Sequence, residues 1–146
     1  MAESSKKEKF EFLDIAPADA SFEAYGKTLS EVFENAALAT FETMVNTKQV
    51  KPLVEKKIEL SAKDLQSLMF DWLNELIFYM GSENLVFSEF SVKIDEKNIK
   101  LVATCRGEKI DQKRHEIRTE VKSATYHQME VKKSGKIWKA RVILDL

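Results

Sequence analysis

The chain has 146 residues, of which 44% are hydrophobic and 32% are charged, and its 23 Lys and Arg nearly balance its 24 Asp and Glu. This length suits one domain with a sizeable core, and the balanced charge excludes a polybasic arm for nucleic acid. The one cysteine, Cys105, cannot form an internal disulfide. The first residues lack the apolar segment of a secretory signal, and no apolar run reaches the ~20 residues of a membrane span. We therefore expect a cytoplasmic protein.

The N-terminal part of the chain predicts a polar tail followed by strands and an amphipathic helix. Residues 1–9 are mostly polar, and we expect them to be a disordered tail. The helix is expected to begin at Thr28, because Thr28 and Glu31 have the spacing of a capping box. Its apolar residues recur with helical spacing: Leu29, Val32, Phe33, Ala36, Ala37, Phe41 and Met44. Such a stripe is typical of a helix face packed on a core.

A second amphipathic helix follows. We expect it to begin at Ser61, with Asp64 in the place of the capping-box acid, and to end at Gly81. Its apolar residues again recur at i, i+3 and i+4: Leu65, Leu68, Met69, Trp72, Leu73, Leu76, Ile77 and Met80. This stripe also predicts a core face and does not resemble a cofactor site.

The remaining segments alternate between apolar and polar residues, as strands do. Seven segments show this pattern: KFEFL, SFEAY, VEKKIEL, LVFSEFSVKI, NIKLVATC, EVKSATYHQMEVK and KIWKARVIL. Residues 95–98 and 133–136 are typical of hairpin turns, the second because it contains Gly135. The order of strands, helix, strand, helix and further strands predicts a single-domain α+β fold with a mostly antiparallel sheet.

The sequence contains little that is typical of an enzyme. Cys105 would act as a nucleophile only if the fold brought it to His115 or His127, and a small buried thiol is the favoured interpretation. No GxGxxG, P-loop or HExxH motif occurs, and the cysteine and histidines are too few for a zinc cage. His127 and its neighbour Tyr126 are expected to fill space and bond locally.

A basic stretch runs from Arg106 to Arg118, but acidic residues alternate with the basic ones. This pattern favours a solvated loop, and contact with RNA or with an acidic partner remains the alternative.

The end of the chain raises a question of charge. The last predicted strand stops at Asp145 and Leu146, so an acidic side chain adjoins the terminal carboxylate. Asp14 and Asp19 flank a Pro-containing segment between two predicted strands, and Asp19 together with the chain end would supply several oxygen donors of the kind that calcium accepts. Because the sequence pattern does not bring these segments together, solvated acids are favoured over a metal site at this point.

Three segments together resemble the archease family: ADASFEAYGKTLSEVFENAALATFETMV, HEIRTEVKSATYHQMEV and WKARVILDL. The resemblance covers residues 10–146, and we expect this range to form an archease domain. VKSATYH and the terminal LDL are similar to the most diagnostic pieces of the family, in the same order and at the same end of the chain.

This resemblance implies a function. Archeases are α+β proteins with no known ligase activity of their own, and they act as protein cofactors of the tRNA-splicing RNA ligase RtcB. They promote guanylylation and multiple turnover of that ligase, which joins 3′-phosphate or 2′,3′-cyclic-phosphate RNA to 5′-hydroxyl RNA. The expected partner is therefore RtcB, and tRNA would be contacted through the ligase. A general chaperone and an independent metal-dependent RNA-processing enzyme are the alternatives.

The resemblance also implies a site. The family holds a metal, seen as Ca²⁺, between an aspartate near the N-terminus and the acidic C-terminal end. That aspartate precedes a Tyr-Gly pair by a fixed interval, which Asp19 matches before Tyr25-Gly26, whereas Asp14 does not. The implied metal ligands are Asp19, Asp145 and Leu146. Lys122 resembles a family position that could contact the ligase or a phosphate, and an ordinary exposed strand lysine is the alternative. The chain departs from the family at residues 16–18, where Ala-Pro-Ala replaces His-Thr-Ala.

Overall fold

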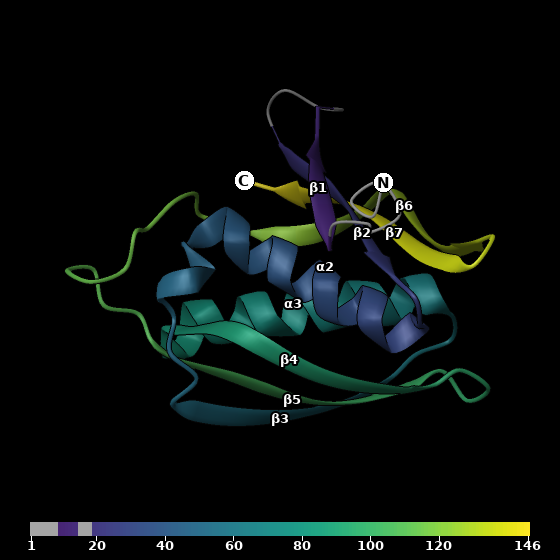
Figure 1. Ribbon diagram of the computed structural model, residues 1–146, viewed down its shortest axis with the longest axis horizontal. Helices are drawn as coiled ribbons and strands as arrows, with labels where there is room; N and C mark the ends of the chain where they lie inside the picture. The colour runs from purple at the N-terminus through teal and green to yellow at the C-terminus, as the bar shows by residue number, and fades with distance from the viewer. Residues whose placement is uncertain (1–8, 15–18) are drawn as a thin grey trace, which may run out of the picture.

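The computed structural model describes residues 9–14 and 19–146, and it contains two antiparallel sheets with two helices between them (Figure 1). The first sheet has the strand order β1-β2-β7-β6 and the second has the order β3-β5-β4. The strands are β1 (Phe10–Leu13), β2 (Ala20–Gly26), β3 (Val54–Ser61), β4 (Leu85–Asp95), β5 (Lys100–Lys109), β6 (Ser123–Ser134) and β7 (Ile137–Asp145). The helices are α2 (Leu29–Met44), the short 3₁₀ helix η1 (Thr47–Gln49) and α3 (Leu65–Glu83).

The predicted α+β class is confirmed, but the strands form two sheets where the sequence pattern suggested one. The strands β3, β4 and β5 pair only with one another among the described residues, so the helices have a sheet on each side. The predicted tail lies outside the described residues except for Lys9, and so do residues 16–18. Among the described residues, neither helix is long and apolar enough to cross a membrane.

The start of α2 is confirmed at its predicted cap. Thr28 is the N-cap, and its Oγ1 accepts a hydrogen bond of 3.1 Å from the Glu31 amide. The Glu31 carboxylate reaches back and accepts a hydrogen bond of 2.7 Å from the Lys27 amide, so two amides at the helix end are satisfied. Because α2 packs on both sheets, its buried residues spread well beyond one narrow stripe.

Both predicted ends of α3 are wrong by a few residues. Ser61 is the last residue of β3 and pairs with Lys100, so it cannot also cap a helix. The N-cap is Asp64 itself, whose Oδ1 accepts a hydrogen bond of 2.8 Å from the Ser67 amide. The helix continues through Gly81 to Glu83, and its C-cap Asn84 adopts the left-handed conformation at φ 56° that Gly or Asn often provides.

Aromatic side chains fill the space between the two sheets. Trp72 of α3 is fully buried, and its indole nitrogen donates a hydrogen bond of 3.0 Å to the Phe33 carbonyl of α2. The Phe41 ring contacts Phe87 and Phe90 of β4 at centroid distances of 5.6 and 6.0 Å. An indole N–H that is buried without a hydrogen-bond partner destabilises the folded state, so this bond constrains how the two helices pack.

The strand β6 is interrupted near its middle. Thr125 pairs with Ile143 and Glu130 pairs with Arg141, so residues 126–129 lie opposite the single residue Val142. Gln128 within this bulge has a φ of 53°. The bulge is held on both sides, because Arg141 donates to the Gln128 carbonyl at 3.1 Å and Gln66 of α3 donates to the Met129 carbonyl at 2.8 Å. Bulges of this kind stop an edge strand from pairing with other chains.

Candidate functional site

The ends of three strands meet at one edge of the first sheet. Ala20 of β2 pairs with Leu144 of β7, and Asp145 of β7 pairs with Ser123 of β6. The Lys122 amide continues this ladder by donating a hydrogen bond of 2.8 Å to the Asp145 carbonyl. The segments that contain Asp19, Asp145 and Lys122, which are far apart in the sequence, therefore come together in the fold.

Asp19 and Asp145 each lie one residue beyond the last pair of the β2–β7 ladder, which joins Ala20 to Leu144. Asp19 directly precedes β2, and continuing the ladder by one residue would put it opposite Asp145. Leu144 is fully buried and Asp145 is exposed, so the Asp145 side chain lies on the sheet face away from the helices. Side chains directly opposite one another in an antiparallel pair have Cβ atoms about 5 Å apart, a spacing at which like charges destabilise the sheet.

Leu146, the third predicted ligand, lies one residue beyond Asp145 at this edge. Its side chain packs against the core. Within the described residues, no group of three or more His, Cys, Asp or Glu side chains is arranged to hold a metal ion. The carboxylates of Asp19 and Asp145 are nevertheless oxygen donors of the type that calcium prefers, and carbonyl oxygens or water would complete its six to eight ligands.

Asp14 does not share this arrangement. Leu13 pairs with Ser21, so one more step of the β1–β2 register places Asp14 opposite Ala20. Because strand side chains alternate between the two faces of a sheet, Asp14 belongs to the face of Phe12 and Phe22, whereas Asp19 belongs to the face of Ser21. Continued by one residue, the two registers put Asp145 level with Asp19, whereas Asp14 falls level with Ala20 on the other face of the sheet.

Lys122 has a fixed backbone and an exposed side chain. Its amide is bonded to Asp145, and no hydrogen bond or ion pair of its ammonium group occurs within the described part of the chain. A lysine held in this way presents a point charge beside the acidic edge.

A buried ionic cluster joins the end of β5 to the loop that follows it, and the sequence pattern did not reveal it. Glu108 and His115 are 6% and 4% exposed, although both lie in the basic stretch predicted as a solvated loop. One Glu108 oxygen accepts from Arg114 at 2.5 Å, and the other accepts from the Lys51 amide at 2.8 Å and contacts His115 Nε2 at 2.9 Å. His115 Nδ1 accepts from the Asp111 amide at 2.9 Å, so Nε2 carries the proton that is donated to Glu108.

These contacts anchor the loop from residue 110 to residue 119, and its two arginines, Arg114 and Arg118, form ion pairs within the protein. Burial by itself would raise the pKa of Glu108, but the hydrogen bonds from Arg114, Lys51 and His115 outweigh it and lower the pKa to about 2. Arg118 is paired with Glu42 at 3.1 Å and with Glu116 at 3.2 Å. Because the guanidinium groups bind acids of the same chain, the loop does not resemble a phosphate-binding surface.

The structure does not assemble the cysteine-histidine pair that was considered from the sequence. Cys105 is fully buried on β5, as predicted, and burial raises the pKa of its thiol to about 12. His115 is committed to Glu108 and Asp111. The expectation that His127 and Tyr126 fill space is wrong, because both are exposed: they lie in the β6 bulge, and Tyr126 stacks on Phe70 with 52% of its surface accessible.

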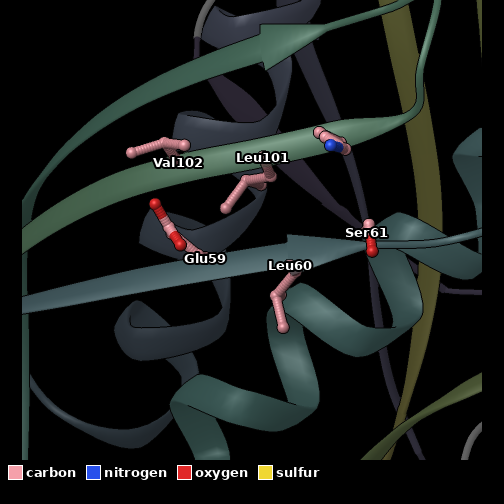
Figure 2. A pocket seen from close by; sticks show the side chains of 6 residues that line it. Glu59, Leu60, Ser61, Leu101 and Val102 are labelled. Atoms are coloured by element: carbon pink, nitrogen blue, oxygen red, sulfur yellow. The ribbon is translucent and has the colours of Figure 1, made fainter.

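A shallow depression of about 330 Å³ lies at one end of the β3–β5 pair (Figure 2). It is lined by Glu59, Leu60, Ser61, Lys100, Leu101 and Val102. Leu60 and Leu101 pair across the strands, and Glu59 is the single carboxylate of the lining. None of the site residues predicted from the sequence lies there, and the acidic edge of the first sheet remains the candidate site.

Comparison with known proteins identifies the family. The model of the archease protein family matches residues 10–146. The chain is 50% identical to the protein archease of Methanothermobacter thermautotrophicus over 139 residues, which cover 94% of this chain and 98% of that protein. The chain belongs to the archease family. It is also 41% identical to the protein archease of Sulfurisphaera tokodaii, with 95% of this chain and 99% of that protein covered.

Two solved archease-like structures have the same fold. The solution structure of Methanobacterium thermoautotrophicum protein 1598 matches with a TM-score of 0.82 at 50% identity, covering 94% of this chain and 99% of that one. The crystal structure of an archease from Thermotoga maritima, described as a possible chaperone, matches with a TM-score of 0.64 at 23% identity, covering 88% and 91% of the two chains. The second likeness bears on the fold alone.

Proposed function

We propose that this protein is a non-catalytic activator of the tRNA-splicing RNA ligase RtcB, and that it works in the cytoplasm. It would promote guanylylation and multiple turnover of the ligase, which joins 3′-phosphate or 2′,3′-cyclic-phosphate RNA to 5′-hydroxyl RNA. Membership of the archease family supports this assignment. The observation that carries it is the convergence of the segments of Asp19, Asp145 and Lys122 at one edge of the sheet. An exposed charged edge suits contact with another protein better than turnover of a small substrate.

The same proposal includes a divalent cation, with Ca²⁺ as the first candidate. Asp19, Asp145 and the Leu146 carboxylate would hold it, and it would offset the repulsion among these three anions. The chain's own contribution is to fix the C-terminal strand end beside the N-terminal segment through the β2–β7 register.

The ligase assay tests the function directly. With limiting cognate RtcB, adding the wild-type protein should raise the yield from less than one to several ligated products per ligase. Asp145→Asn keeps the shape of the side chain and removes its charge, so we expect stimulation to fall at least tenfold. Asp14→Asn is the matched control, because it removes the same charge from a nearby position on the other face of the sheet. This variant should stimulate the ligase as the wild type does.

Other results of this assay would contradict the proposal. Unchanged ligation with the wild-type protein would remove the activator function. A stable GMP adduct on this chain, or ligation in the absence of RtcB, would favour an independent enzyme. Suppression of aggregation of an unrelated unfolded protein, without stimulation of the ligase, would favour a general chaperone.

Calcium binding has a separate readout in thermal unfolding. A ligand that binds only the folded state stabilises it by about 2.7 kcal/mol at a hundredfold excess over Kd, which for a domain of this size raises Tm by roughly 5 °C or more. Asp19→Asn and Asp145→Asn should each abolish most of this rise, and Asp14→Asn should preserve it. Added residues after Leu146 convert the terminal carboxylate into a peptide carbonyl, so they should weaken the calcium response without unfolding the domain. A tagged protein with an undiminished response would exclude the terminus from the ligand set.

A further inference from the structure

The helix α3 covers the free edge of β6 through side chains that contact it at regular intervals. Asn74 acts as a neighbouring strand would, since its amide nitrogen donates to the Ala124 carbonyl at 3.3 Å and its oxygen accepts from the Ala124 amide at 2.9 Å. One turn earlier, the Phe70 ring lies parallel to the Tyr126 ring, with centroids 4.0 Å apart and an interplanar angle of 4°. These contacts show that α3 and β6 run antiparallel.

The spacing of these contacts, continued one turn further along α3, puts Phe78 at the level of Lys122. Four helix residues rise about 6 Å and two strand residues about 6.6 Å, so each turn of α3 advances β6 by two residues. Phe70 lies level with Tyr126 and Asn74 with Ala124. The next level joins Phe78, which is 61% exposed, with Lys122, whose side chain is also exposed.

We name this area the α3–β6 surface and define it by Phe70, Phe78, Lys122 and Tyr126. Large aromatic side chains are costly to expose, and two of the seven large exposed hydrophobic residues in the described part of the chain, Phe78 and Tyr126, lie here. The surface is continuous with the candidate site, because the Lys122 amide is bonded to the Asp145 carbonyl.

The charges around the α3–β6 surface favour a protein over RNA. The stretches 70–78 and 120–127 contain three acids, Asp71, Glu75 and Glu120, and one lysine, Lys122. RNA phosphates would be repelled by this balance, and an RNA-binding surface needs an excess of cations. An enzyme that holds RNA ends must itself be cationic near its substrate, so its surface would complement this acidic rim.

We infer that RtcB docks on the α3–β6 surface, with Phe78 and Tyr126 as apolar anchors and the acidic rim facing basic groups of the ligase. The inference rests on the proposed function and adds to it that two parts of the surface have different roles. The aromatic residues provide affinity, and the acidic edge with Asp19 and Asp145 provides the stimulation. Exposed aromatic residues that become fully buried are the usual source of binding energy in protein interfaces.

Titrating the variants against a fixed amount of RtcB in the ligation assay separates the two roles. Phe78→Ala and Tyr126→Ala should each raise the concentration for half-maximal stimulation at least tenfold and leave the rate at saturation unchanged. Asp145→Asn should lower the rate at saturation instead. Tyr126→Phe keeps the ring stacked on Phe70 and should stay within threefold of the wild type. Leu53→Ala is the matched control, because Leu53 is 72% exposed next to β3 of the other sheet, and it should have no effect.

Each other outcome has a distinct meaning. If the wild type stimulates RtcB and both alanine variants do so at wild-type concentrations, the docking surface is wrong and the proposed function stands. If the wild type neither binds nor stimulates RtcB, the proposed function fails, and the docking inference fails with it. If Phe78→Ala and Tyr126→Ala lose affinity for a 5′-hydroxyl oligoribonucleotide while RtcB titration is unchanged, the surface binds RNA and the docking inference is overturned.

Discussion

Replacing Gly107 with alanine should strongly destabilise the protein. Gly107 lies on β5 between Val54 of β3 and Phe87 of β4. A Cβ atom added there would lie 1.8 Å from the Val86 carbonyl oxygen and 2.7 Å from the Phe87 Cα. Both obstacles are backbone atoms of a paired strand, so no side-chain rotation relieves the overlap. We expect a loss of about 4 kcal/mol or more in the free energy of unfolding, from a total that is typically 5–15 kcal/mol.

Gly81→Ala is the matched control for this change. Gly81 lies within α3, and apart from its chain neighbours and the nearby backbone of its own helix, an added Cβ atom would meet nothing within 4 Å. Alanine also favours helix over glycine by about 1 kcal/mol, so this variant should be slightly more stable than the wild type. Urea unfolding followed by circular dichroism measures both variants. A Gly107→Ala protein within 1 kcal/mol of the wild type would show that β4 and β5 are not packed at this position as described.

Local signals in the sequence predicted the elements well. The Thr28 cap was found because its hydrogen bond to the Glu31 amide depends on residues three apart. Both hairpin turns were also found, and Gly135 has the positive φ of 65° that its turn requires. The error at the start of α3 arose because Ser61 and Asp64 are both good caps, and only the pairing of Ser61 with Lys100 decides between them.

Contacts between distant segments were beyond the sequence pattern. Strand alternation does not tell which strands pair, so the division into two sheets could not be read from it. The burial of Glu108 and His115 depends on Arg114 and on the Lys51 amide, which lies more than fifty residues earlier. The pairing of Asp19 with Asp145 in one site follows from the family resemblance and not from the strand pattern. The β2–β7 register brings these two residues to the same end of the neighbouring strands, and a metal bound there is our proposal.

The buried Glu108 cluster should make stability depend on pH in the acid range. Its pKa of about 2 lies below the ordinary value of 4.5, so the unfolded chain takes up this proton first as pH falls. The stabilisation is therefore complete above about pH 4.5 and is lost progressively as pH falls towards 2. Each unit of difference between the folded and unfolded pKa corresponds to about 1.4 kcal/mol. Because Arg114 is partly exposed, solvent screens its charge, and we reduce the expected contribution to about 2 kcal/mol at neutral pH.

Glu108→Gln tests this dependence, because glutamine keeps the size of the side chain and removes its charge. Compared with the wild type, the variant should lose about 2 kcal/mol in the free energy of unfolding at pH 7 and roughly half of that at pH 3. Other acids whose pKa is lowered, such as Asp64 and Glu42, are present in both proteins and cancel in the difference. Glu120→Gln changes an exposed acid of the same loop region and should have little effect at either pH. Urea unfolding at several pH values measures the difference. A destabilisation by Glu108→Gln that is equal at pH 7 and pH 3 would mean that Glu108 acts through its shape and hydrogen bonds, without the charge that holds Arg114 and the loop in place.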